Sequence, residues 1–148
     1  MEFKIAYKGD ATILAELRKQ QLIDEGQTPN INIDHELKNY FLSILSNNSS
    51  TVWIATDNNI AIATGSVCFF QHPPSYSNPT GKIAYIHSVY TATEYRRQGI
   101  SSRILTKIMK EVEKRNCKVI QLKASDDGKF VYEKLGFTAY DGYMILKI

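Results

Sequence analysis

The stretch YRRQGISSRIL, residues 95–105, places two arginines and one glycine directly before an amphipathic run. An ordinary helix begins with Ser, Thr, Asp or Asn as its cap, whereas this one offers Gly99 and small hydroxyl residues. Glycine lets the backbone approach a ligand closely, and successive N–H groups at a helix start can form a concave anion site. The stretch therefore predicts a helix whose N-terminus holds a negatively charged group. Residue types alone support equally an alternative, in which the arginines are solvated and Gly99 only turns the chain.

Two familiar phosphate-binding motifs are excluded. A Walker loop needs Ser or Thr after its Gly-Lys pair, but Ile83 and Phe130 follow the only two such pairs in the chain. A dinucleotide-binding fingerprint needs three spaced glycines, and Gly99 has none two residues before it or three residues after it.

Hydrophobic periodicity predicts the elements around this stretch. Strands are expected at residues 3–7, 51–56, 60–70, 82–91, 117–124 and within 137–148, and the second and third form a hairpin around residues 57–59. Helices are expected after Asp10, from Asp34, from Ser101 and within 126–137, the last ending at Gly136. The helix from Asp34 carries an apolar stripe that we assign to the core, made of Leu37, Tyr40, Phe41, Ile44 and Leu45.

This order of elements predicts an α/β (α+β) domain with a mixed, mostly antiparallel central sheet flanked by helices. The strand, helix and strand that span residues 82–124 imply one parallel pair. Ligands in such sheets tend to bind at the carboxyl ends of strands, where the stretch 95–105 begins. We expect one domain over residues 1–148.

Composition narrows the function further. The formal charge of +3 comes from 18 basic and 15 acidic residues, which is too mild for a nucleic-acid-binding protein and fits a local anion site better. No apolar run is long enough to span a bilayer. Cys68 and Cys117 lie far apart and no secretory signal precedes them, so we expect both reduced, in a cytoplasmic protein. His35 and His72 show no metal-ligand spacing, and no metal is expected.

The segment VYTATEYRRQGISSRIL, followed by FVYEKLGF at 130–137, resembles the GCN5-related N-acetyltransferase (GNAT) superfamily. That family has a pyrophosphate loop of the pattern Arg/Gln-x-x-Gly-x-Gly/Ala. Arg96, Gly99 and Ser101 occupy its three marked positions, and Ser101 departs from the usual Gly or Ala while remaining small. The resemblance implies a GNAT-type sheet, in which a splayed parallel strand pair holds the cofactor.

The same resemblance implies an acetyl-CoA site. Pantetheine would pair with the backbone at the end of the strand 82–91, and the pyrophosphate would accept bonds from N–H groups of the following loop. The cofactor-binding residues implied are Val89, Tyr90, Thr91, Arg96, Arg97, Gln98, Gly99, Ile100, Ser101, Ser102 and Ser125, the last standing where the family has an asparagine.

The implied reaction is direct transfer of an acetyl group from acetyl-CoA to a primary amine. Tyr132 matches the family's tyrosine near the cofactor sulfur and is the predicted general acid, although a helix tyrosine ordinarily serves packing. His87 is a candidate base because its unperturbed pKa lies near neutrality, against the alternative of a packed strand histidine. Asp24, Glu25 and Asp34 are candidates to attract a cationic acceptor, against the alternative of solvated helix ends.

Two other functions compete with the enzyme. A non-catalytic acyl-CoA-binding sensor would keep the same loop, and a nucleic-acid-binding domain ranks last because Glu111 and Glu113 interrupt the lysines of the helix after Ser101. The acceptor, a small molecule or a peptide amine, stays open because specificity resides in loops. The oligomeric state is open too, with a homodimer among the alternatives.

Overall fold

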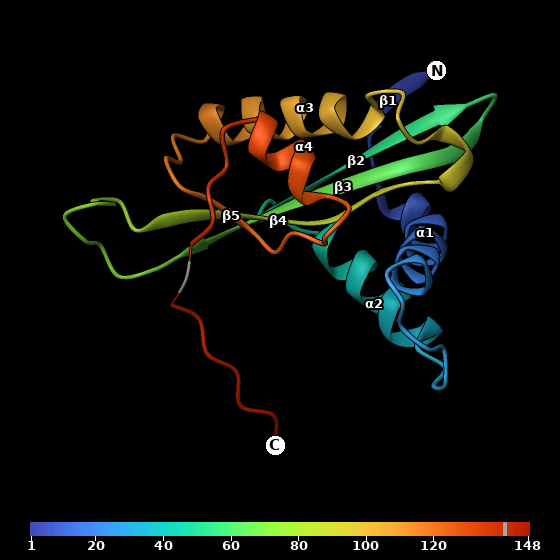
Figure 1. Cartoon of the computed structure of the whole chain (residues 1–148), viewed down its shortest axis with the longest axis horizontal. Coiled ribbons are helices and arrows are strands. Elements are labelled where there is room, and N and C mark those ends of the chain that lie inside the picture. The colour runs from blue at the N-terminus through green and yellow to red at the C-terminus, as the bar shows by residue number, and fades with distance from the viewer. Residues whose placement is uncertain (141) are drawn as a thin grey trace.

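The structure is a computed structural model that describes residues 1–140 and 142–148, and a five-stranded sheet forms its centre (Figure 1). The strands lie in chain order, and the first four are antiparallel neighbours while the last pair is parallel. Their bounds are β1 Glu2–Ile5, β2 Ser50–Asp57, β3 Ile60–Gln71, β4 Lys82–Thr91 and β5 Ile120–Leu122. The predicted mixed, mostly antiparallel sheet with one parallel pair is confirmed.

Helices cover both faces of this sheet (Figure 1). Helices α1 (Ala11–Asp24) and α2 (Asp34–Ile44) pack on one face, and α3 (Ile100–Lys114) and α4 (Lys129–Lys134) lie on the other. Short 3-10 turns at Lys8–Asp10 and Thr93–Tyr95 precede α1 and α3. Within the described residues, no helix has the length and apolar character required to cross a bilayer.

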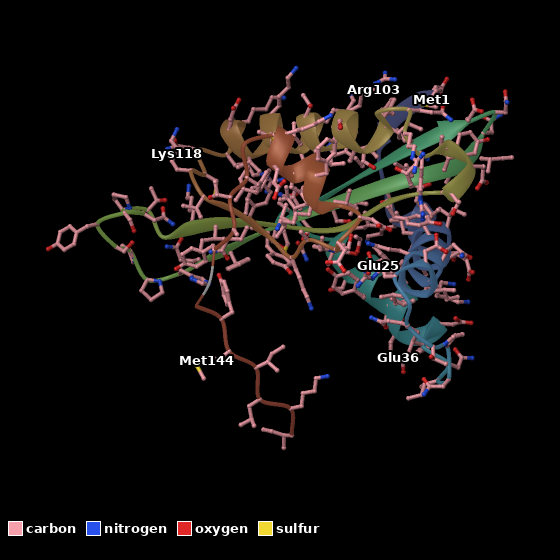
Figure 2. All side chains as sticks on the ribbon, viewed as in Figure 1. Met1, Glu25, Glu36, Arg103, Lys118 and Met144 are labelled. Atoms are coloured by element: carbon pink, nitrogen blue, oxygen red, sulfur yellow. The ribbon has the colours of Figure 1, made fainter. Side chains whose placement is uncertain are left out.

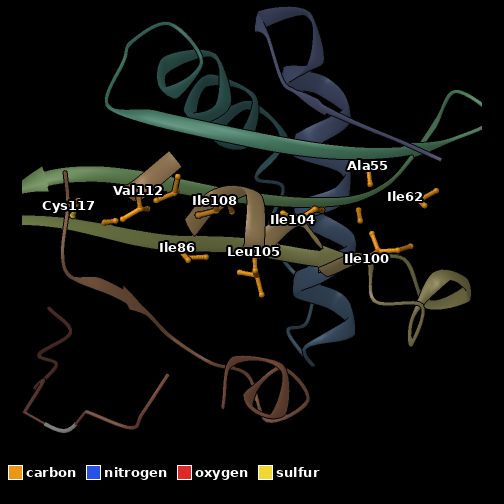
Figure 3. Close-up of a cluster of buried hydrophobic side chains, with 12 residues drawn as sticks. Ala55, Ile62, Ile86, Ile100, Ile104, Leu105, Ile108, Val112 and Cys117 are labelled. Atoms are coloured by element: carbon orange, nitrogen blue, oxygen red, sulfur yellow. The ribbon is translucent and has the colours of Figure 1, made fainter. Parts of the chain in front are cut away.

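The larger core lies between the sheet and α3 (Figure 3). Ile100, Ile104, Ile108 and Val112 repeat every four residues and therefore share one face of the helix, where each is at most 2% exposed. They pack against sheet residues of the same cluster, among them Ile62, Ala63, Val67 and Ile86. This contact fixes the first turn of α3 against the end of β4.

A second core lies on the opposite face of the sheet. Leu14 of α1 and Phe41 of α2 are buried there against Val52 and Ile54 of β2. Residues 52 and 54 point to the same side of the strand because successive side chains alternate. The sheet thus separates two apolar clusters, one beneath α3 and one beneath the first two helices.

The hairpin between β2 and β3 has the predicted turn. Asn58 and Asn59 both adopt left-handed backbone, with φ of 47° and 66°. A two-residue turn with positive φ at both positions matches the right-handed twist of paired strands, and asparagine tolerates it.

Three predictions differ from the structure. Strand β5 covers only Ile120–Leu122 of the predicted range 117–124, because β4 pairs with no more of it. The last predicted strand is wrong, since residues 137–140 and 142–148 form no strand. Tyr40 is not a core residue: it is 42% exposed, and its hydroxyl makes a hydrogen bond to His87.

Candidate active site

Strands β4 and β5 diverge halfway along β4. Their pairing joins Ala84–Ile86 to Ile120–Leu122, whereas β4 continues for five more residues to Thr91. At the point of divergence Ser88 adopts φ of 52°, and the register between β3 and β4 shifts across Thr64 and Ser66. Such a bulge bends the strand and re-aims its backbone groups. The end of β4 therefore has no sheet neighbour on the β5 side.

The loop from Arg97 to the first turn of α3 carries a run of free N–H groups. Arg97 and Gly99 have positive φ, of 62° and 73°, and no side chain caps the helix. Among the described residues, no acceptor lies within hydrogen-bonding distance of the N–H groups of 97–102. A Cβ added to Gly99 would meet nothing within 4 Å, so this concave backbone opens to solvent. The arrangement suits an anion.

Two contacts hold this loop to β4. The hydroxyls of Thr91 and Ser101 are hydrogen-bonded at 2.8 Å, so the serine at the third marked position ties α3 to the strand end. Arg96 Nε donates to the carbonyl oxygen of Thr91 at 3.0 Å. Arg97 and Gln98 are exposed, and no acidic side chain pairs with Arg97 among the described residues.

Arg96 is engaged by the protein itself. Its Nη2 donates to Asp24 Oδ2 at 2.6 Å, and its guanidinium lies 5.7 Å from the ring centroid of Tyr90. Hydrogen bonds from Gln20, then Tyr90 and Arg96, hold the pKa of Asp24 below its usual value despite partial burial. Burial first, and Asp24 second, raises the pKa of Tyr90 to about 12. The backbone of Arg96 is thus part of the loop before α3, and its side chain fixes this loop to Thr91 and Asp24.

Helix α1 reaches the diverging strand through Gln21, which the sequence analysis missed. Gln21 is 6% exposed, and its Nε2 donates to the carbonyl oxygen of Val89 at 3.1 Å and to Glu25 Oε1 at 2.9 Å. Its Oε1 accepts from Arg18 Nη1 at 2.9 Å. The available sequence signal was a polar residue, Gln21, within an apolar helix pattern. Such a residue indicates a specific hydrogen bond, because buried polar groups need partners.

His87 directly precedes Ser88 at the bulge of β4, and its ring lies between two hydroxyl groups. Its Nε2 is 3.1 Å from Tyr40 Oη and its Nδ1 is 3.0 Å from Ser88 Oγ. Burial, with a smaller effect of Arg18, lowers the pKa of His87 to about 4. The imidazole is therefore neutral near pH 7. His87 itself belongs to β4, four residues before its end, and the structure adds Tyr40 as its neighbour.

Tyr132 packs on the α3 side of the sheet. It belongs with Val89 to the partly buried side chains around the larger core, and its ring meets Phe137 edge-on at 5.9 Å between centroids. Burial, and then Glu25 at the end of α1 (labelled in Figure 2), raises the pKa of Tyr132 to about 12. Its hydroxyl has no side-chain or backbone partner within the described residues and is not among the buried polar atoms, so it reaches solvent. Tyr132 is therefore a protonated phenol with a free donor.

Ser125 shapes the turn before α4. Its Oγ accepts from the N–H of Gly128 at 3.2 Å, and its carbonyl oxygen accepts from the N–H of Lys129 at 3.0 Å.

Asp34, a candidate for attracting an acceptor, pairs with Lys19 at 2.8 Å. No group of three metal-ligating side chains occurs in residues 1–140 and 142–148.

The structure thus places diverging strands beside a helix start with free N–H groups, which together form a candidate anion-binding site. Residues 14–137 match the family described as Acetyltransferase (GNAT) family, and the chain belongs to that family. No curated protein matches the chain.

Solved structures agree with this assignment. A predicted acetyltransferase with acetyl-CoA from Clostridium acetobutylicum is 42% identical, with a TM-score of 0.94 over 99% of this chain and 95% of its own. A GCN5-related N-acetyltransferase from Ralstonia eutropha shares the fold at 18% identity, with a TM-score of 0.91 over 99% and 97% of the two chains. Glucosamine-6-phosphate N-acetyltransferase from Arabidopsis thaliana shares the fold at 21% identity, with a TM-score of 0.72 over 99% of each.

Proposed function

We propose that this protein transfers an acetyl group from acetyl-CoA directly to a primary amine. The observation that carries the proposal is the run of free N–H groups at residues 97–102, placed where β4 and β5 diverge. An acetyl-CoA-containing relative at 42% identity supports the same cofactor.

The residues present fit coenzyme A. The N–H groups of 97–102 can donate to a pyrophosphate, the α3 dipole favours its charge, and Arg97 adds an exposed cation. The unpaired edge of β4 from His87 to Thr91 can accept an extended pantetheine as an added strand. The carbonyl oxygens of Val89 and Thr91 already accept one side-chain donor each and retain a second lone pair.

When bound, acetyl-CoA supplies an acetyl thioester. The amine nitrogen forms a bond to the carbonyl carbon, and the bond from that carbon to sulfur breaks. A backbone N–H that the bulge at Ser88 turns toward the diverging edge of β4 would stabilise the negative charge that develops on the carbonyl oxygen. Tyr132 keeps its proton at neutral pH, and that proton passes to the departing sulfur.

The amine must also lose a proton. His87 is neutral, and its two nitrogens are occupied by the hydroxyls of Tyr40 and Ser88. His87 can accept this proton only through one of these hydroxyls and only transiently, because burial disfavours the imidazolium, so solvent is the final acceptor. Tyr40 and His87 act together in this role.

Calorimetry with acetyl-CoA, followed by thiol release with a panel of amines, tests the proposal. We expect binding in the wild type and loss of binding in the Arg97→Glu, Gly99→Asp double variant. We also expect amine-dependent thiol release that Tyr132→Phe suppresses without weakening binding. No binding by the wild type would overturn the assigned loop.

The second candidate function, a sensor that binds acyl-CoA without turnover, gives a different result. It predicts binding with no thiol release from any amine and an identical response from Tyr132→Phe. The phenol of Tyr132 favours the enzyme, because it keeps its proton at neutral pH and can serve as the proton donor that turnover requires.

A further inference from the structure

Arg18 of α1 is a partly buried cation to which the described part of the chain gives no counter-ion. Within residues 1–140 and 142–148 its guanidinium makes one hydrogen bond, from Nη1 to Gln21 Oε1 at 2.9 Å. Arg115, the other partly buried arginine, pairs instead with Glu111 at 2.9 Å. A guanidinium has five N–H donors, and a charge taken partly out of water is normally paired. Most donors of Arg18 are therefore not used by the described residues and can serve an anionic ligand.

Gln21 connects Arg18 to the diverging part of β4. Gln21 Nε2 donates to the carbonyl oxygen of Val89 at 3.1 Å while its Oε1 accepts from Arg18, so one side chain lies between the guanidinium and the strand. Burial, and then the charge of Arg18, lowers the pKa of His87 to about 4, which requires the guanidinium to be near that imidazole. The free cation thus lies beside the part of β4 where the acceptor of the proposed reaction must meet the thioester.

Glu25 supplies the opposite charge on the other side of Gln21. Gln21 Nε2 also donates to Glu25 Oε1 at 2.9 Å, and no cation pairs with Glu25 among the residues that the structure describes. After the larger effect of burial, Glu25 raises the pKa of Tyr132, so this carboxylate lies toward the proposed proton donor. Asp24 and Asp34, the other two candidates for attracting an acceptor, pair with cations of the protein. An unpaired cation and an unpaired anion therefore flank one buried glutamine.

We propose that the acceptor is a small amine that carries a carboxylate, as an amino acid does, and that Arg18 binds this carboxylate. A guanidinium can hold a carboxylate through two parallel N–H bonds, and Glu25 attracts the ammonium form in which such an amine arrives. One cation with Glu25 nearby suits a carboxylate better than a more highly charged phosphate. The inference rests on the proposed transfer reaction and names its substrate class. The deprotonated nitrogen forms the bond to the acetyl carbon, the bond to sulfur breaks, and the carboxylate is unchanged.

Matched pairs of acceptors test the inference through thiol release. Each α-amino acid is compared with its carboxamide, which keeps the amine and the side chain but lacks the negative charge. In the wild type we expect kcat/KM to be about tenfold or more higher for the acid, because a hydrogen bond between charged groups is worth that much. Equal or faster release with the carboxamides would overturn the inference and leave the proposed function standing.

The Arg18→Gln variant shows whether Arg18 is the source of this preference. We expect the ratio of kcat/KM between acid and carboxamide to fall about tenfold or more, with an unchanged dissociation constant for acetyl-CoA. The ratio cancels any effect of Arg18 on His87, because both acceptors share it. Lys19→Gln is the matched control: it removes a cation from the next position of α1, where it pairs with Asp34, and should keep the wild-type ratio. An unchanged ratio in Arg18→Gln would contradict the inference.

Calorimetry with amino acids in the presence of coenzyme A detects the carboxylate site without turnover. Binding that Arg18→Gln weakens about tenfold or more, and that the carboxamides do not show, would support the inference even where no thiol is released. That combination would count against the proposed function alone. Neither binding nor thiol release with any amino acid would overturn the inference.

Discussion

Asp24 Oδ2 lies 2.6 Å from Arg96 Nη2, although the two residues are 72 positions apart in the chain. The same carboxylate oxygen accepts the hydroxyl of Tyr90 at 3.0 Å. One side chain therefore joins the end of α1, the end of β4 and the loop before α3. The α1 side carries Gln21 and Glu25, and the loop carries the free N–H groups, so Asp24 couples the two halves of the site.

Replacing Asp24 with Asn removes the charge and keeps the shape. We expect the dissociation constant for acetyl-CoA to rise roughly 5- to 20-fold, because a hydrogen bond to a charged group is worth about 1.5 kcal/mol and orders the loop here. Calorimetry measures the change. Asp34→Asn, which removes a carboxylate paired with Lys19 at the surface, is the control and should leave the constant within twofold. Equal effects of the two variants would show that Asp24 does not order the loop.

Replacing Tyr132 with Phe removes the proposed proton donor and keeps the ring against Phe137. We expect kcat to fall about 10²-fold or more, with the dissociation constant for acetyl-CoA unchanged. Because burial raises the pKa of Tyr132 to about 12, the wild-type rate should show no loss from this group up to about pH 10. An alkaline decline near pH 9 that disappears in Tyr132→Phe would contradict this assignment of the pKa.

His87 makes the stability of the fold sensitive to acid. Its pKa falls from an ordinary 6.5 to about 4 in the folded state, so below pH 6.5 the unfolded chain binds a proton that the folded chain excludes. The stabilisation is complete above pH 6.5 and is lost as the pH falls to 4, by about 3 kcal/mol. Denaturant unfolding at several pH values measures this slope. It should flatten in His87→Gln and persist in His72→Gln, which removes a surface histidine.

Replacing Gly99 with Ala separates strain from binding. At φ of 73° an alanine costs about 1 kcal/mol of folding stability, although its Cβ would meet no atom within 4 Å. We expect that modest loss together with a weaker affinity for acetyl-CoA, because the methyl group stands among the donors. Gly26→Ala has the matched geometry, with φ of 90° and no neighbour within 4 Å, but lies outside the loop. It should lose similar stability and keep its affinity; a matching affinity loss would remove Gly99 from the site.

The sequence predicted the elements whose pattern is local. The turn at Asn58 and Asn59, the strand Lys82–Thr91 and the helix after Gly99 are where propensity, periodicity and turn chemistry agree. It predicted too long a β5 and a final strand that residues 137–140 and 142–148 do not form, because a strand pattern shows the capacity to pair and not whether pairing occurs. The loop before α3 could be found from the motif that Arg96, Gly99 and Ser101 form. Tyr40 could not, because the packing of α2 against the sheet brings it to His87. Gln21 left only the weak signal of a polar residue in an apolar helix pattern. Asp24 was expected to attract an acceptor, and the structure pairs it with Arg96 and Tyr90.

The two cores on opposite faces of the sheet bear on how such a protein diverges. Helix α3 and its loop rest on one core, and α1 with α2 rests on the other. Substitutions in separate cores that share no contacts have nearly independent effects on stability. A lineage can therefore remodel the α1 and α2 side while inheriting the loop at residues 97–102 unchanged. Only positions that bridge the faces constrain this freedom, and the carboxylate of Asp24 is one of them.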